Sequence, residues 1–154
     1  MATGHMLTNR GKLLLMQGHW DDAGVSAVKW GMVKVQAAAH DTAVEIADLN
    51  TVSDLVAGGS TECDFTNYAR AALTRVNAAE DDANDRVGLD ANDIVIAVAG
   101  GATNNTIVGV FFYDATTDTN DTTRLLISVD WLAAGQATNG GQITYAITDL
   151  YRAA

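Results

Sequence analysis

The chain has 154 residues, 48% of them hydrophobic, and its 19 acidic against 9 basic side chains give a formal net charge of −10. This length favours a single domain with a hydrophobic core, and the apolar content argues against intrinsic disorder. The negative charge repels phosphate backbones and anionic lipid headgroups, so we expect no nucleic-acid partner and no membrane partner. No apolar run approaches the roughly 18 residues of a membrane span, and no secretory signal is visible.

The N-terminal residues divide into two parts. Met1–Met6, MATGHM, resembles a cloning remnant, because a second Met follows a Gly-His pair. We therefore expect residues 1–6 to be a tag or disordered remnant, and residues 7–154 to form a single β domain. Leu7–Gly18 predicts a short helix that begins after Thr8 as N-cap and stops at Gly18. Gly11 weakens this prediction by about 1 kcal/mol relative to Ala.

Three elements are expected between residues 28 and 59. Val28–Val35 predicts a strand with Val28, Trp30 and Met32 on one face, in which a glycine at position 31 allows a bulge or a close approach. The stretch Ala43–Ile46 is expected to be a short edge strand. Apolar residues at helical spacing in Asp48–Gly59 predict a helix over one end of a sheet.

The next segment predicts a hairpin. Phe65 and Tyr68 are expected to anchor the core. Ala69–Val76 predicts a strand, and the acidic turn AAEDDAND connects it to Arg86–Leu89, so the two segments are expected to pair.

Two apolar runs dominate the middle of the chain. Ile94–Ala99 and Thr106–Tyr113 are separated by GGATNN, a pattern that predicts a β-hairpin. The second run is apolar on both expected faces, which are Ile107, Phe111 and Tyr113 on one side and Val108, Val110 and Phe112 on the other. Such a strand belongs at the centre of a packed β structure.

The C-terminal part predicts two further strands. Arg124–Trp131 alternates, with an expected face formed by Leu125, Ile127, Val129 and Trp131. Gly140 and Gly141 introduce a last strand, with an expected inward face formed by Ile143, Tyr145 and Ile147. Together these patterns predict an all-β, single-domain β-sandwich or jelly roll of about seven to eight strands with one or two short helices.

Residues that carry catalysis or bind metals are few. The three histidines show no ligand spacing to one another or to Cys63, so we expect no metal site and no cofactor. Acidic neighbours on both sides of Cys63 oppose thiolate formation and favour an inert thiol. No nucleophile elbow, P-loop or dinucleotide motif is present, and we expect no enzymatic activity.

Two other features leave alternatives open. The acidic loops Asp81–Asp85 and Asp118–Asp121 offer clustered oxygen ligands that suit calcium, although Asx-rich turns are the favoured interpretation. Trp30 and Trp131 lie on apolar strand faces and are expected in the core. Trp20 stands beside polar residues and is expected to be partly exposed.

Four segments carry a resemblance to a known family. LTNRGK near the start, DLNTVSDL in the middle, DFTNYARAAL and DDANDRVGLDANDIV resemble small β-rich virion proteins of tailed bacteriophages, encoded among the capsid and tail genes. The resemblance covers most of the chain after Leu7, and its motifs mark strands and turns. It implies a virion component made in the bacterial cytoplasm, and it transfers no catalytic residue.

Among such components, capsid decoration (cement) proteins are commonly compact β-sandwiches or jelly rolls of this size. The resemblance therefore favours a protein that binds and stabilises the outer surface of the head, with the major capsid protein as partner. A homotrimer is the favoured assembly, because a cyclic oligomer can match a local symmetry axis of the shell. Short N-terminal segments often make the capsid contacts in such proteins, so the candidate contacts are Leu7, Arg10, Lys12 and Leu14. The alternative is a tail, neck or fibre component that recognises a host receptor or glycan.

Overall fold

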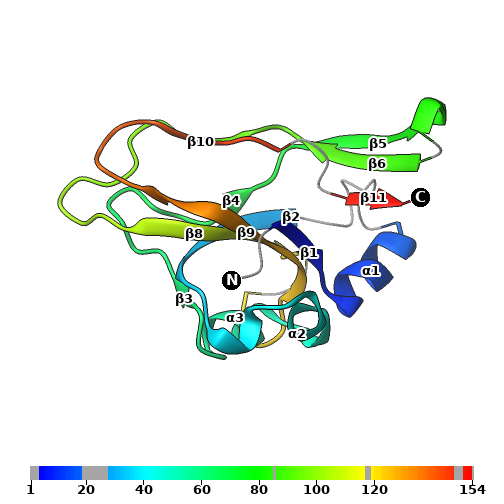
Figure 1. The fold of residues 1–154 in the computed structure, drawn as a ribbon, viewed down its shortest axis with the longest axis horizontal. Helices are drawn as coiled ribbons and strands as arrows, with labels where there is room; N and C mark the ends of the chain where they lie inside the picture. The colour runs from blue at the N-terminus through cyan, green and yellow to red at the C-terminus, as the bar shows by residue number, and fades with distance from the viewer. Residues whose placement is uncertain (1–3, 19–27, 85, 117–118, 148–150, 154) are drawn as a thin grey trace.

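The computed structural model describes residues 4–18, 28–84, 86–116, 119–147 and 151–153. In these ranges, eleven strands, three short α-helices and two single-turn 3₁₀ helices form a layered structure (Figure 1). The predicted all-β class is confirmed. The strands are more numerous than expected because several are only two or three residues long, and there is one α-helix more than expected. None of the helices in these ranges is long and apolar enough to cross a membrane.

A six-stranded antiparallel sheet forms the middle layer. Its order is β1 (Gly4–Leu7), β9 (Leu125–Ala137), β8 (Thr106–Asp114), β2 (Val28–Val35) and β3 (Thr61–Glu62), with β4 (Ala71–Ala72) also paired to β2. Strand β8 therefore has a partner on each edge, as its two apolar faces predict.

A second layer of strands covers one face of this sheet (Figure 1). It contains the pair β7 (Ile94–Ile96) and β10 (Ile143–Tyr145), and the three-stranded group β5 (Arg75–Asp81), β6 (Arg86–Ala91) and β11 (Tyr151–Ala153). A hairpin is present around AAEDDAND, as β5–β6 closed by η2 (Asp82–Asn84). Its predicted bounds are wrong, because the start of β6 pairs with Ala79–Asp81, which were expected in the turn. Apolar side chains between the two layers, including Trp30, Phe65 and Phe112, form what we call the sandwich core.

Helices cover the opposite face of the sheet. Following η1 (Ala38–His40), α2 (Ala43–Asp48) and α3 (Val52–Val56) lie beneath it in Figure 1. Ile46, Val52 and Leu55 pack with Phe111 and Trp131 to form what we call the helix-side core. The remaining helix, α1 (Asn9–Met16), packs on β9.

The predicted hairpin between the two central apolar runs is wrong. Strand β7 pairs with β10 and β8 pairs with β9, so the two runs lie in different layers. Between these pairs, Thr138 N–H donates to the Asn105 carbonyl at 2.9 Å and Gly140 N–H donates to the Ala99 carbonyl at 2.7 Å. The segment β7–β8 therefore runs antiparallel to the segment β9–β10, and this two-stranded ribbon bends from one layer to the other. The two apolar runs do not pair with each other because both pair with the same downstream segment.

The faces of β8 are as predicted only beyond Gly109. Phe111 points into the helix-side core and Phe112 into the sandwich core, as expected. Ile107 and Val108 are reversed, with Ile107 in the sandwich core and Val108 against the helix-side core. The pairing with β9 changes register between Ile107 and Gly109, so alternation does not continue across this point.

A second irregularity corrects the predicted face of β9. Leu125 and Ile127 lie at the sandwich core, but Val129 and Trp131 lie in the helix-side core. The cause is a register shift where β9 passes the Phe112 and Tyr113 positions of β8. An extra residue in one strand reverses the direction of every side chain that follows.

Three predicted boundaries are also corrected. Ala43–Ile46 is not an edge strand but the start of α2, where the side chains of Thr42 and Glu45 form a capping box. The helix expected over Asp48–Gly59 is limited to α3, which begins with its own capping box at Thr51. The strand expected over Ala69–Val76 is divided, because β4 belongs to the main sheet and β5 to the upper layer.

Residues 4–6 belong to the main sheet. His5 pairs with Asp130 and Met6 with Val129, and Met6 packs against the helix-side core. Residues 4–6 are therefore ordered and not disordered, whereas the expectation that residues 1–6 are a tag stays a prediction and residues 1–3 lie outside the described ranges. An extended segment ahead of α1 can use the open edge of β9 whatever its side chains, because the pairing is made by backbone groups.

Candidate functional site

The predicted contact segment forms a compact unit of β1 and α1 held against β9. Thr8 is the N-cap of α1, as predicted, and its hydroxyl accepts a hydrogen bond from Gly11 N–H at 2.7 Å. The same hydroxyl donates to the Leu126 carbonyl at 2.6 Å, and Thr8 N–H donates to the Ile127 carbonyl at 3.0 Å. Gly18, with φ of 77°, follows the end of the helix. The cap thus fixes the helix to the sheet as well as starting it.

Gly11 explains how closely α1 approaches the sheet. A Cβ atom at this position would lie 2.0 Å from the carbonyl oxygen of Ile127, so only glycine permits the observed contact. Leu14, one turn further on, is buried in the sandwich core. Gly11 lowers the intrinsic stability of the helix, but the close packing of α1 on β9 requires a glycine at this position.

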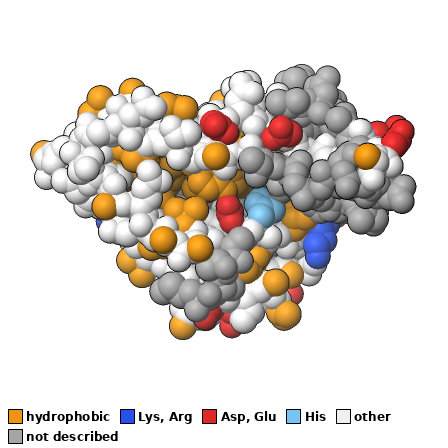
Figure 2. Space-filling model, turned by 45° about the horizontal axis from the view of Figure 1, so that its top comes forward, with side chains coloured by type: hydrophobic (Ala, Val, Ile, Leu, Met, Phe, Trp, Pro, Cys, Tyr) orange, Lys and Arg blue, Asp and Glu red, His pale blue; other side chains and the backbone are white. Residues whose placement is uncertain are grey.

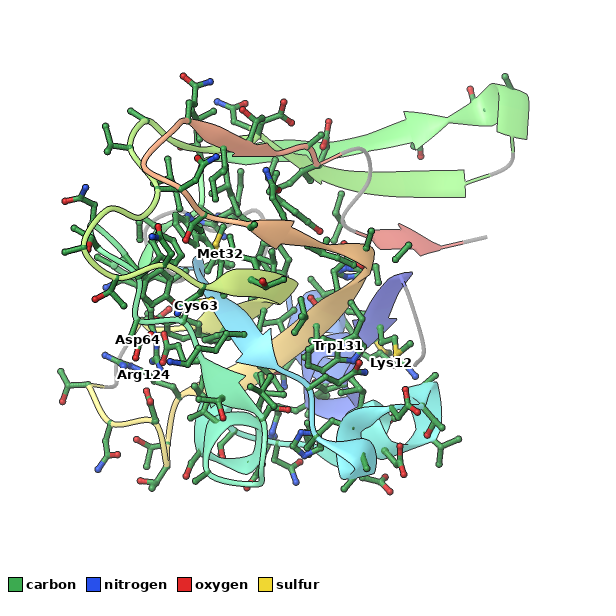
Figure 3. All side chains as sticks on the ribbon, turned by 60° about the vertical axis from the view of Figure 1, so that its left-hand side comes forward. Lys12, Met32, Cys63, Asp64, Arg124 and Trp131 are labelled. Carbon is green, nitrogen blue, oxygen red and sulfur yellow. The ribbon has the colours of Figure 1, made fainter. Side chains whose placement is uncertain are left out.

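The structure brings the four candidate contacts together on one unit but does not expose them equally. Leu7 and Arg10 are half-buried, and Lys12 is exposed. Leu14 is only 4% exposed, so it is part of the core and cannot be a contact residue. Figure 3 shows Lys12 on the side of the molecule away from Cys63 and Arg124.

Two contact candidates were missed by sequence reasoning. Leu13 is 42% exposed and Met16 is 87% exposed, and they are three residues apart on α1. Residues at this spacing share a helix face, and Lys12 lies four residues before Met16. The position of Leu14 in the core identifies the opposite side of the helix as the outward one. We call the exposed set Lys12, Leu13 and Met16 the α1 face.

A polar cluster lies between the main sheet and the upper layer. His5 and Asp130 are paired across β1 and β9, and the Tyr145 hydroxyl of β10 donates to the Asp130 carboxylate. Burial lowers the pKa of His5, against the opposing effect of Asp130. The buried Nε2 of His5 and Oγ of Ser128 have no hydrogen-bond partner among the described residues. Figure 2 shows apolar side chains gathered in a hollow in the middle of this face of the molecule. Because Ser128 is fully buried, the cluster offers no accessible nucleophile.

An ionic network ties the loop before β9 to the edge of the sheet. The Arg70 guanidinium donates to both carboxylate oxygens of Glu62 and of Asp121, at 2.6–2.8 Å. Arg124 donates to Asp121 at 2.8 Å, and Arg70 also lies 5.4 Å from the centroid of the Phe111 ring. The hydrogen bonds with Arg70 are the main reason that the pKa of Asp121 is lowered. The side chains of this network are mostly buried, and its two arginines are balanced by its two carboxylates. This arrangement indicates a structural role.

This network predicts a loss of stability in acid. The folded-state pKa of Asp121 lies below the unfolded value of about 3.9, so its contribution is complete above about pH 5 and is lost as pH falls through the folded pKa. Arg70→Met should lower the free energy of unfolding at pH 7 by about 1–2 kcal/mol, a value discounted for partial solvent screening. Urea denaturation at several pH values should show a weaker acid dependence for the variant. Lys34→Met, which removes the pair with the exposed Asp64, is the matched control. An unchanged acid dependence in Arg70→Met would contradict the assignment.

The remaining nucleophile and base candidates lie inside the fold. Burial raises the pKa of the Cys63 thiol to about 12, as expected for an inert thiol. His40 Nδ1 lies 2.8 Å from Ser60 Oγ, but both residues are buried, and Ser60 Oγ accepts a hydrogen bond from Ala37 N–H. This pair links η1 to Ser60, the residue before β3. His19 lies outside the described ranges.

The acidic loops do not assemble a metal site in the described part of the chain, where no group of three or more His, Cys, Asp or Glu side chains converges. Asp121 is engaged by Arg70 and Arg124. Asp85 and Asp118 lie outside the described ranges, so the calcium alternative for these loops stays a hypothesis. Trp30 and Trp131 are buried, as predicted, whereas Trp20 lies outside the described ranges.

Comparison with known proteins does not assign the chain to a family. No family model, no curated protein and no solved structure matches it. The function is therefore a matter of proposal, based on the resemblance of four sequence segments and on the surface that α1 presents.

Proposed function

We propose that this chain is a structural component of a tailed-phage virion, without a catalytic role, that decorates the outer surface of the head. The observation that carries the proposal is the α1 face. It combines two exposed apolar side chains with Lys12 on a helix that its cap and Gly11 hold in one position. A rigid surface loses little conformational entropy on binding, so a small contact can suffice.

Charge supports an acidic patch of the major capsid protein as the partner. The chain carries a net charge of −10, yet the exposed Lys12 lies on the α1 face, and the half-buried Arg10 lies two residues earlier on the same helix. Opposite charges at the rim of an apolar contact speed association and fix its orientation. A homotrimer would present three such faces to a local symmetry axis, and linked contacts reinforce one another through effective concentration.

The test is co-sedimentation with expanded empty heads of the phage that encodes the chain. The triple variant Lys12→Glu, Leu13→Ser, Met16→Ser should lose at least tenfold in affinity, about 1.4 kcal/mol or more. Substitutions are preferable to deletion of residues 1–16, because deletion removes a paired strand and the buried Leu14. Val98→Ser, which alters an apolar side chain of similar exposure on the loop after β7, is the matched control.

The outcomes separate the role from the site. If the wild-type protein fails to pellet with heads and labels tail tips in intact virions, decoration is wrong and the tail or fibre alternative takes its place. If the triple variant binds heads as well as the wild type does, decoration holds but the α1 face is not the contact. Native mass spectrometry of the free protein tests the trimer.

A further inference from the structure

A small cavity lies where the edges of the two strand layers meet. Its volume is about 230 Å³, and its walls come from Trp30 on β2, from Ala71–Thr74 at β4, and from Asn92–Val95 leading into β7. Pockets for drug-sized ligands occupy about 300–1,000 Å³, so this one suits a ligand the size of a single six-membered ring with its substituents.

The apolar wall exists because a small residue stands opposite a large one. Trp30 pairs with Ala71 across β2 and β4, so the two side chains share the face that looks toward the upper layer. The methyl group of Ala71 leaves the space beside the indole open. Trp30 itself is held in the sandwich core and is only 7% exposed, which gives the cavity a rigid aromatic boundary.

The polar wall is held in place by backbone contacts. Asn92 N–H donates to the Thr74 carbonyl at 2.8 Å, which fixes the two rims relative to each other. Asp93 Oδ1 accepts from Ile147 N–H at 2.9 Å, which orients the carboxylate. Within the described ranges, Asp93 Oδ2, the Asn92 amide group and the Thr74 hydroxyl have no hydrogen-bond partner in the chain. All three residues are exposed.

We propose that this cavity binds one pyranose ring of a neutral sugar. A pyranose presents C–H groups that can lie against an indole, and hydroxyl groups that both donate and accept. The sugar hydroxyls can donate hydrogen bonds to the Asp93 carboxylate, which only accepts. They can both donate to and accept from the Asn92 amide and the Thr74 hydroxyl. The inference does not rest on binding to phage heads.

Other ligand classes fit less well. An anion would meet the Asp93 carboxylate in a chain of net charge −10. A purely apolar group would leave Thr74, Asn92 and Asp93 without water or partners, at a cost for each desolvated polar group. An ammonium group would satisfy Asp93 and the indole but could not donate to and accept from the other two side chains.

The experiment uses the full chain and the methyl glycosides of glucose, galactose, mannose and N-acetylglucosamine. Saturation-transfer NMR should detect at least one of them, with a Kd on the order of 1 mM. Ala71→Leu should abolish the signal by filling the cavity. Ala57→Leu is the matched control, because it adds the same side chain at an exposed position that is not part of the cavity wall. Asp93→Ala should weaken binding about tenfold.

Three results would overturn the proposal. The first is no saturation transfer from any glycoside at about 50 mM, well above the expected Kd. The second is binding that survives in Ala71→Leu while circular dichroism shows that this variant is folded. The third is binding of methylammonium without binding of any glycoside. An Ala71→Leu variant that fails to fold is replaced by Thr74→Val with Asn92→Leu, which removes polar groups at the exposed rim and should also abolish the signal.

Discussion

Phe111→Ala and Phe112→Ala should each lower the free energy of unfolding by about 3–5 kcal/mol, although the two residues are neighbours on one strand. Both rings are fully buried, and they lie in different cores, Phe111 on the helix side and Phe112 in the sandwich. Removing either ring leaves a cavity in a close-packed layer that neighbouring strands cannot fill. The Phe111 ring also covers Gly31, where a Cβ atom would lie 2.3 Å from it.

Urea denaturation followed by circular dichroism measures both effects. Met16→Ala, which shortens a side chain that is 87% exposed, serves as control and should change stability by no more than about 0.5 kcal/mol. A strand with only one buried face would give one large and one small effect. A loss below about 1 kcal/mol for either Phe variant would therefore show that β8 does not separate two cores.

Gly11→Ala should destabilise the protein by about 1–3 kcal/mol, opposite in sign to the effect of helix propensity. In an exposed helix, replacing Gly by Ala stabilises by up to about 1 kcal/mol. Here the new methyl group would lie 2.0 Å from the Ile127 carbonyl oxygen, which belongs to the backbone and cannot rotate away. Helix α1 must then move off β9, which strains the Thr8 cap and the packing of Leu14.

The matched control is Lys12→Ala, at the next position of the same helix. Its side chain is exposed, so stability should stay within about 0.5 kcal/mol of the wild type. Thermal and urea unfolding of the two variants measure the difference. If Gly11→Ala raises the free energy of unfolding, α1 does not make the close contact with the sheet on which the α1 face depends.

Features that depend on residues close together in the chain can be predicted from the amino-acid sequence alone. Thr8 as a cap, the presence of a hairpin around AAEDDAND and the central position of β8 follow from local hydrogen bonding, turn composition or apolar faces. The bounds of that hairpin do not. The start of α2 also has a local signal, which is Thr42 followed three residues later by Glu45. The prediction of an edge strand at Ala43–Ile46 overlooks this capping signal. Local signals of this kind need no knowledge of the rest of the chain.

Which strands pair and which side chains face outward depends on contacts that form only in the folded chain. The apolar runs in β7 and β8 are separated by a turn-like segment, yet both pair with the segment from β9 to β10. The register shifts near Gly109 and Leu126 reverse faces that alternation had extended without interruption. In α1, the close approach at Gly11 places Leu14 inward and Met16 outward. Pairing, register and helix rotation are set by contacts between residues far apart in the chain, and periodicity within one segment carries no information about them.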